Sequence, residues 1–397
     1  MRGGRPIIGR MSISESVLAS TSTRSSVPLT VRDRILALRD ALVRRPGFQR
    51  WAAAFPLTRA IARRRSRAVF DICAGFVYTQ TLDACVRLDL FALLAHGPLT
   101  PSDISVATSL PLDGVRRLLR AAEALRLVGA RSAGRFGLGA LGAPLLADPG
   151  VLRMIEHNRM LYSTIADPVE VLRGNRDATA IGRFFAYASS ATPESLPTAD
   201  VAPYSALMTA TVEPIAAEVL DVCSLGDARS LVDVGGGEGG FVAAAAARHP
   251  KLSLTLFDLP AVVERAEARL ARAGMSDRVT VVGGDFHHDP VPAGADVVTL
   301  VRVLLDHDDD AVRGLLARVR AALPSGGRVI IAEALAGVRG ARVVGDVYFG
   351  FYLAAMGGGR ARTAAELREF LREAGFRRTR VVPTRYPVHT GVVIGTV

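Results

Sequence analysis

Apolar residues in the C-terminal half of the chain recur with two periods, one typical of strands and one typical of helices. Five apolar runs of strand length alternate with segments of helical periodicity, at residues 230–234, 253–258, 279–283, 296–302 and 328–333. Such alternation is typical of a parallel sheet with helices on both faces. Two more β segments flank residues 387–389 and predict an antiparallel strand pair at the end of the sheet. We therefore expect an α/β, Rossmann-like domain over residues 228–397.

Between residues 68 and 150 the pattern predicts three helices followed by a short hairpin. Ser102 fits the start of one helix, a second helix covers residues 112–125, and residues 128–138 turn back on themselves. This order is typical of a winged helix, a unit that binds DNA in some proteins and forms dimers in others. The second helix carries only three arginines, so we expect dimerisation here and not a DNA groove contact.

The segment over residues 31–67 is basic, helical and partly aromatic. Apolar residues recur at helical spacing in its first third, and Phe48, Trp51 and Phe55 share one face of the next helix. Arginines surround both helices. Aromatic residues ringed by arginines are typical of a helix at a membrane surface, and a helical arm packed against a second subunit has the same pattern. Both interpretations stay open.

Composition limits the compartment and the partners. The chain has 397 residues, of which 49% are hydrophobic, and a formal net charge of +11. The positive residues are almost all arginine and are spread widely, so we expect no nucleic-acid partner. Cys73, Cys85 and Cys223 form no CxxC pair, which indicates a reducing, cytoplasmic compartment. No run reaches the roughly 18 to 20 apolar residues that span a bilayer, and we expect at most a peripheral membrane location and no bound metal.

These patterns divide the chain into five segments. Residues 1–30 are rich in serine, arginine and glycine and form an expected disordered tail, in which Met11 is an alternative start to Met1. The other segments are a basic helical arm at 31–67, a winged-helix dimerisation domain at 68–150, a helical linker and substrate cap at 151–227, and the α/β domain at 228–397.

A glycine-rich turn, Asp233-Val-Gly-Gly-Gly-Glu-Gly-Gly240, follows the first strand of the α/β domain. Glycines at this place let the backbone approach a ligand closely. Gly235, Gly237 and Gly240 also satisfy the GxGxxG pattern of nicotinamide enzymes. A pyrophosphate at the following helix would be repelled by Asp233 and Glu238, whereas an acidic group suits the cationic methionine moiety of S-adenosylmethionine. The turn therefore favours S-adenosylmethionine as the cofactor.

Acidic residues also end the next two strands. Asp258, followed by Leu259, is placed to accept hydrogen bonds from both ribose hydroxyls. After the third strand, Gly284 precedes Asp285, which can bind the adenine amino group, and Phe286, which can cover the ring. Three carboxylates at successive strand ends are hard to explain by structure alone, and together they predict an S-adenosylmethionine site.

These motifs resemble the cation-independent O-methyltransferases, the family that includes plant caffeate and vertebrate acetylserotonin methyltransferases, over about residues 70–397. The resemblance implies a class I methyltransferase domain, a homodimer and a cofactor contact at Arg302. The family has a catalytic histidine and two supporting glutamates. In this chain the histidine falls on Leu305 and one glutamate on Ala361, and only the other glutamate is retained, as Glu333. Either activity is lost, or the acceptor is an alcohol for which alignment of the reacting atoms does most of the work.

Three stretches, at residues 48–65, 157–168 and 348–356, closely resemble the demethylspheroidene O-methyltransferases of carotenoid biosynthesis, which methylate the tertiary C1 hydroxyl of an acyclic carotenoid. The resemblance implies a hydroxycarotenoid substrate. The apolar run near residue 350 could line a slot for a polyene. The candidate substrate contacts are Tyr162, Tyr348, Phe351, Tyr352 and Met356, and the candidate bases are His157, His307 and Glu333.

Two other functions stay open. The protein could methylate another small alcohol or phenol, or it could be a winged-helix regulator that binds DNA and keeps the cofactor pocket as a sensor. Retention of Asp233, Asp258, Asp285 and Arg302 favours methyl transfer over the regulator.

Overall fold

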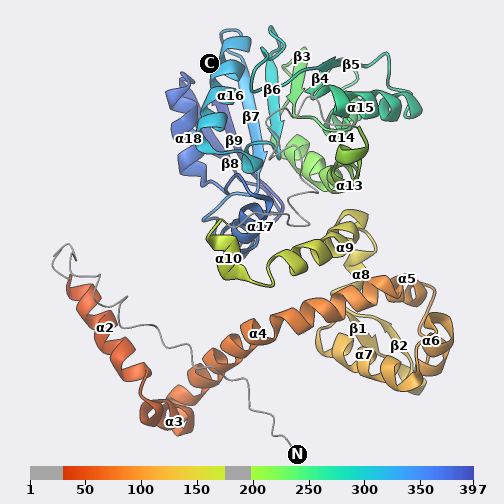
Figure 1. Ribbon diagram of the computed structural model, residues 1–397, viewed down its shortest axis with the longest axis vertical. Coiled ribbons are helices and arrows are strands. Elements are labelled where there is room, and N and C mark those ends of the chain that lie inside the picture. The colour runs from red at the N-terminus through yellow and green to blue at the C-terminus, as the bar shows by residue number, and fades with distance from the viewer. Residues whose placement is uncertain (1–29, 175–197) are drawn as a thin grey trace, which may run out of the picture. The chain divides into compact units, whose positions relative to one another are not determined.

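The computed structural model describes residues 30–174 and 198–397 (Figure 1). Its contacts divide the chain into two units, residues 1–78 and residues 79–397, and each unit is described by itself. The disordered tail expected at residues 1–30 lies outside the described residues except for Thr30. Part of the expected linker, at residues 175–197, also lies outside them.

A seven-stranded sheet forms the centre of the second unit. In sheet order its strands are β5 (Val279–Gly283), β4 (Ser253–Asp258), β3 (Ser230–Val234), β6 (Val297–Val301), β7 (Arg328–Glu333), β9 (Gly391–Thr396) and β8 (Arg378–Val382). The first five are mutually parallel, and β9 is antiparallel to both of its neighbours. The α/β fold with an antiparallel end is therefore confirmed. Because β3 lies between β4 and β6, the strand order reverses at β3, where ligands bind in open α/β sheets.

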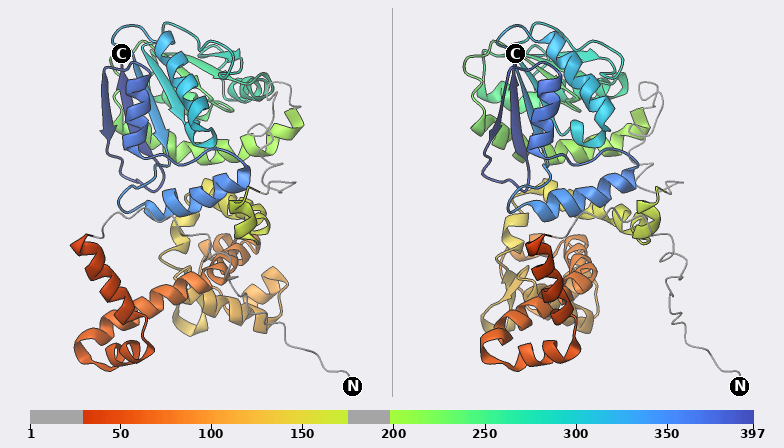
Figure 2. Two further views of the ribbon diagram at one scale, coloured as in Figure 1. Left: turned by 60° about the vertical axis from the view of Figure 1, so that its left-hand side comes forward. Right: turned by 90° about the vertical axis from the view of Figure 1, so that its left-hand side faces the viewer.

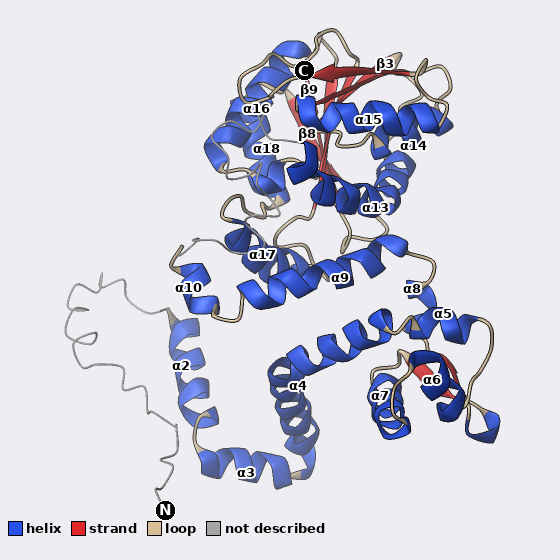
Figure 3. Ribbon diagram, turned by 45° about the vertical axis from the view of Figure 1, so that its right-hand side comes forward, coloured by secondary structure: helices blue, strands red, loops and turns tan. Residues whose placement is uncertain are grey.

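Helices cover both faces of the sheet and enclose two separate cores. Leu231 of β3 packs with Val242 on one face, and the next residue, Val232, packs with Leu316 on the other. The side chains of neighbouring residues point to opposite faces because a strand has a period of two residues. Figure 3 shows the helices of the two faces on either side of the red strands. They are α13 (Thr198–Val222), α14 (Gly240–Arg248) and α15 (Pro260–Arg272) on one face, and α16 (Asp309–Ala322) and α18 (Ala364–Glu373) on the other.

A group of helices packs against the segment that follows β6. Leu305 from that segment joins Leu161, Leu353 and Met356 in a small apolar cluster of its own. Both views of Figure 2 show the blue helix α17 alongside the yellow-green helices. The helices concerned are α9 (Pro149–Thr164), α10 (Pro168–Leu172), the π-helical turn η4 (Val343–Tyr348) and α17 (Phe349–Met356). The carboxyl end of β6 is therefore covered by protein.

The region before α9 consists of helices followed by a hairpin, as expected. Its elements are α5 (Leu90–Ala95), α6 (Pro101–Thr108), α7 (Leu112–Ala124), β1 (Val128–Ala130), η1 (Ser132–Gly134), β2 (Phe136–Leu138) and α8 (Gly142–Leu145). Leu90, Leu119 and Val128 belong to its own core. The expected helix start at Ser102 is wrong, because Thr100 caps α6 and Asp103 completes the capping box. Pro101 occupies the first helical position, which suits a residue without a backbone N–H.

The first unit consists of exposed helices. They are α2 (Val31–Val43), α3 (Pro46–Ala54) and the first part of α4 (Pro56–Arg87), which runs without a break through the boundary expected at residues 67 and 68. Trp51 stacks on Phe55 with ring centroids 5.1 Å apart, and it remains 51% exposed. Among the described helices, none combines the length and the hydropathy needed to cross a bilayer.

Candidate cofactor and acceptor site

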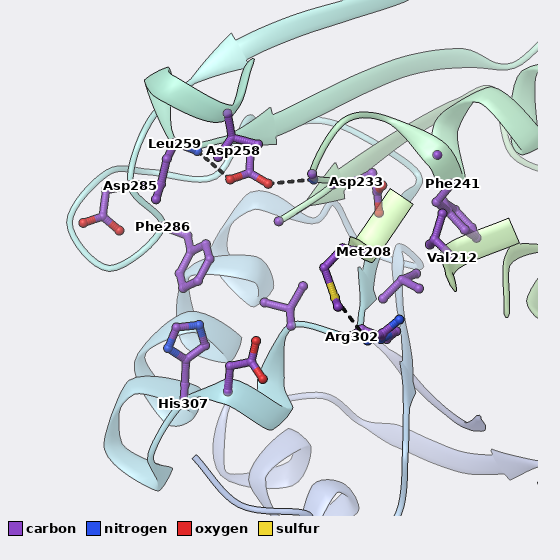
Figure 4. Close-up of a pocket in the computed structure, with 18 of the residues that line it drawn as sticks. Met208, Val212, Asp233, Phe241, Asp258, Leu259, Asp285, Phe286, Arg302 and His307 are labelled. Atoms are coloured by element: carbon purple, nitrogen blue, oxygen red, sulfur yellow. Dashed lines mark hydrogen bonds between the residues drawn. The ribbon is translucent and has the colours of Figure 1, made fainter. Parts of the chain in front are cut away.

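A pocket of about 1050 Å³, partly open to solvent, lies where β3, β4 and β6 end (Figure 4). Eight of the nine residues expected to bind the cofactor line it: Asp233, Gly235, Gly237, Asp258, Leu259, Asp285, Phe286 and Arg302. The ninth, Gly284, does not. A Cβ there would lie 2.6 Å from the Phe257 ring, so this glycine serves the packing of the loop. The sequence had given no sign that Met208 and Val212 of α13 also line the pocket.

The glycine turn after β3 needs its glycines for two different reasons. Gly235 has φ of +68°, and a Cβ on it would lie 2.7 Å from the side chain of Val303. Gly237 has φ of +57° with open space around it, so only its backbone conformation demands glycine. The backbone N–H of Gly235 donates to the carbonyl of Phe257 on β4 at 2.8 Å. The turn is therefore fixed in place with its backbone facing the pocket.

Asp233 places a buried carboxyl group beneath that turn. Its side chain is 1% exposed, and its Oδ1 accepts a hydrogen bond from the hydroxyl of Thr299 on β6 at 2.6 Å. Its Oδ2 has no hydrogen-bond partner within the part of the chain that the structure describes. Burial raises the pKa of Asp233 to about 7. A cation in the pocket would favour the ionised form of this group.

Asp258 connects the end of β4 to the glycine turn. Its Oδ2 accepts from the backbone N–H of Gly237 and its Oδ1 from that of Leu259, both at 2.7 Å, as the dashed lines in Figure 4 show. Burial raises its pKa to about 6, and the two hydrogen bonds oppose that shift. A carboxylate oxygen accepts more than one hydrogen bond, so both oxygens could still accept a hydroxyl of a ribose.

The loop after β5 forms an aromatic wall of the pocket. The Phe286 ring lies edge-on to His307 with centroids 5.2 Å apart, and His287 lies 4.9 Å from His307. Asp285 is buried, and its Oδ1 accepts from the backbone N–H of His287 at 2.8 Å. The rings of Phe286, His287 and His307 suit contact with the flat face of a nucleotide base such as adenine. His307, a candidate base, thus lies on the cofactor side, and burial lowers its pKa to about 4.

Arg302 stands between this pocket and a smaller one of about 350 Å³. Its guanidinium donates to the hydroxyl of Thr211 at 2.6 Å and contacts the sulfur of Met208 at 3.1 Å. Its backbone has φ of +59°, an uncommon value for a residue with a side chain. Strained backbone of this kind is found preferentially at functional sites.

The smaller pocket is largely apolar. Of the expected substrate contacts, Tyr348 and Tyr352 line it, whereas Tyr162, Phe351 and Met356 do not. Leu305, on which the family histidine falls according to the sequence resemblance, is also part of its wall. The complete lining is Met154, Met208, Arg302, Leu305, Asp306, Tyr348, Phe349 and Tyr352. Met208, Arg302 and Asp306 belong to both pockets, so the two adjoin.

His157, another candidate base, lies behind the wall of the smaller pocket. Its Nε2 is 2.7 Å from the hydroxyl of Tyr352, and burial lowers its pKa to about 4. The neutral ring accepts a hydrogen bond from the Tyr352 hydroxyl at Nε2 when its own proton is on Nδ1. The neighbouring Asn158 accepts a hydrogen bond from the hydroxyl of Tyr348 at 2.8 Å. The polar atoms of α9 therefore orient Tyr348 at the end of η4 and Tyr352 of α17.

Glu333, the third candidate base, supports the loop after β6 and lines neither pocket. Its Oε1 accepts from the backbone N–H groups of Val303 at 2.8 Å and Leu304 at 2.7 Å. Burial first, and the charge of Asp306 second, raise its pKa to about 8. On the other side of the same loop, the buried Arg362 donates to the carbonyl of Leu304 at 2.6 Å. The loop is therefore held from two directions.

Comparison with known proteins agrees with this geometry. The chain matches the O-methyltransferase domain family over residues 162–377 and the O-methyltransferase dimerisation domain family over residues 70–148. It is 44% identical to a demethylspheroidene O-methyltransferase of Cereibacter sphaeroides, with 86% of this chain and 89% of that protein covered. A protein of the same name from Rhodobacter capsulatus is 40% identical, with 85% and 84% covered.

Solved structures give the same result. The calicheamicin biosynthesis methyltransferase CalO1, in a form bound to SAH, is 28% identical with a TM-score of 0.64, and 84% of this chain and 98% of that one are covered. The S-adenosylmethionine-dependent methyltransferase SibL is 26% identical with a TM-score of 0.68, with 83% and 98% covered. The chain therefore belongs to the O-methyltransferase family, and it is an S-adenosylmethionine-dependent enzyme.

Proposed function

We propose that this enzyme transfers a methyl group from S-adenosylmethionine to the tertiary C1 hydroxyl of an acyclic hydroxycarotenoid. The observation that carries the proposal is the largely apolar pocket that adjoins the cofactor pocket, in which Leu305 stands at the position of the family's histidine. An apolar wall suits a polyene, and an alcohol gains less than a phenol from a histidine base. The names of the two relatives at 44% and 40% identity support the same substrate class.

Features of the larger pocket fit S-adenosylmethionine. The buried Oδ2 of Asp233 suits the cationic methionine end, Asp258 suits the ribose, and the rings beside Phe286 suit the adenine. When bound, the cofactor supplies an electrophilic methyl group on a sulfonium centre. The residues of the chain bind it, exclude water and align the acceptor oxygen with that group, and this alignment accounts for most of the rate acceleration expected for an alcohol.

Transfer to a carotenoid is tested with the purified protein, labelled S-adenosylmethionine and two acceptors in detergent. We expect label in a hydroxycarotenoid with a tertiary C1 hydroxyl, with kcat/KM about tenfold or more above that for caffeate, because the pocket is apolar and lacks the family histidine. Chromatography of the extracted products separates the two methyl ethers. Label in caffeate with none in the carotenoid would contradict the proposed substrate.

The dimerisation domain supports a homodimer. Phe70, Ile72 and Phe76 of α4 are 66%, 81% and 71% exposed, and the match to the dimerisation family begins at residue 70. Between residues 68 and 82 the only charged residue is Asp71, in contrast to the basic segment before it. A bare apolar surface of this kind on a dimerisation domain suits a second copy of the chain.

Dimer formation is tested by measuring the molecular mass of the protein by light scattering as it elutes from a size-exclusion column. The wild-type mass should be that of two chains, and Ile72→Asp should shift it toward one chain, because an unpaired carboxylate is costly to bury at an interface. Val388→Asp, at a 46% exposed valine outside the dimerisation domain, is the control and should leave the mass unchanged. A wild-type monomer, or an Ile72→Asp dimer of undiminished stability, would refute the homodimer at this face.

The basic arm at residues 31–67 supports peripheral contact with an anionic membrane. It carries eleven arginines and only two aspartates, and its apolar residues Trp51, Leu57 and Ile61 are 51%, 80% and 56% exposed. Arginine near an anionic surface contributes about 1 kcal/mol per residue, and aromatic rings add apolar burial in the headgroup region. Such contact would place a cytoplasmic enzyme beside a substrate that dissolves in lipid.

Membrane contact is tested by flotation of the full chain with phosphatidylglycerol vesicles and with pure phosphatidylcholine vesicles. The protein should float only with the anionic vesicles, and a triple Arg→Gln change at Arg63, Arg64 and Arg65 should weaken flotation by about tenfold or more at physiological salt. The matched control changes Arg116, Arg117 and Arg120 of α7, all exposed, in the same way. Equal losses in both triple variants would contradict a specific role for the arm.

A further inference from the structure

Asp306 lies where the cofactor pocket meets the smaller pocket, which under the proposed function is the acceptor pocket. It is the last residue of the short turn η3 (Leu304–Asp306) after β6, and it lines both pockets. Among the described residues that line the acceptor pocket it is the only carboxylate. Resting on the proposed function, we propose that Asp306 is the general base that takes the proton of the acceptor hydroxyl.

The backbone around Asp306 is held from three directions. The carboxyl of Glu333 accepts from the N–H of Leu304, and the guanidinium of Arg362 donates to the carbonyls of Leu304 at 2.6 Å and His307 at 2.7 Å. Gly359, with φ of +76°, lies so close that a Cβ on it would be 2.8 Å from the Cα of Asp306. A base on so constrained a segment keeps its position relative to the acceptor, which proton transfer requires.

The other candidate bases are placed less well. His307 lines only the cofactor pocket, where it packs against Phe286. His157 is separated from the acceptor pocket by Tyr352, to which its Nε2 is bonded. Glu333 lines neither pocket, and its Oε1 is engaged by two backbone N–H groups. Asp306 is the carboxylate that borders both the methyl donor and the acceptor.

A carboxylate is sufficient for this reaction because an alcohol need not ionise first. As the bond from the hydroxyl oxygen to the methyl carbon forms, the bond from that carbon to sulfur breaks and its electron pair stays on sulfur. The oxygen becomes strongly acidic as it gains the methyl group, and its proton passes to an Oδ atom of Asp306. The products are a methyl ether, a neutral thioether and a protonated Asp306, which later releases the proton to water.

The test compares Asp306→Asn and Asp306→Ala with Asp310→Asn, an aspartate nearby in the chain that is 99% exposed. With the hydroxycarotenoid as acceptor, both Asp306 variants should lose about 100-fold to 10,000-fold in kcat, the range typical of a missing general base. Calorimetry should give a dissociation constant for S-adenosylmethionine within about threefold of wild type, which also shows that the variants fold. Asp310→Asn should match wild type in both measurements.

Chemical rescue separates a base from a residue that only supports the loop. Added formate should restore part of the kcat of Asp306→Ala and leave Asp306→Asn unchanged, because only the smaller side chain leaves space for a carboxylate. A kcat for Asp306→Asn within threefold of wild type, or a complete lack of rescue by formate, would overturn this inference alone. Wild-type protein that binds S-adenosylmethionine and leaves the carotenoid unmethylated would overturn the proposed function, and the inference with it.

Discussion

The site is organised around the carboxyl group of Asp233, which is buried near the end of strand β3. One of its oxygens is fixed by the Thr299 hydroxyl on β6, and the other faces the glycine turn without a partner among the described residues. Burying an unpaired carboxylate is unfavourable, and the raised pKa of about 7 expresses that cost. A cationic ligand near this carboxyl would lower the cost, so the site suits positive charge.

The rest of the site follows from this strand. Because β3 lies between β4 and β6, the segments after all three strands meet at one edge of the sheet. Asp258 at the end of β4 fixes the glycine turn through the N–H of Gly237, and the segment after β6 carries Arg302 and Asp306 to the junction of the two pockets. Glu333 and Arg362 hold that segment with four hydrogen bonds to its backbone. Binding of the donor and binding of the acceptor thus depend on the same few hydrogen bonds, those that hold the glycine turn and the segment after β6.

Sequence patterns predicted β3, β6 and β7 well because these strands are buried on both faces and therefore read as apolar runs. They also placed Asp233, Asp258 and Asp285 in the pocket, since strand ends in a parallel sheet lie at a common edge, whereas Arg302 came from the family resemblance. They failed where a contact depends on distant residues. The packing of Gly284 against Phe257, and the approach of Met208 from α13, leave no local signal. No local pattern marks Asp306 as a base, because its place at the junction of the two pockets depends on residues that are distant in the sequence.

The pH dependence of cofactor affinity tests most directly whether the buried Asp233 carboxyl binds the cationic donor. With a folded pKa of about 7 against 3.8 for the ordinary group, Asp233 stabilises the free protein at low pH and loses that contribution as the pH rises through 7. A bound cation favours the ionised form, so affinity should instead increase with pH. Calorimetry should show S-adenosylmethionine binding about tenfold more tightly at pH 8 than at pH 6.

In Asp233→Asn that difference should shrink to about twofold and overall binding should weaken, while Asp113→Asn, at a side chain that is 95% exposed, should behave as wild type. An affinity in the wild-type protein that is constant or falls between pH 6 and pH 8, or an equal slope in Asp233→Asn, would contradict the account.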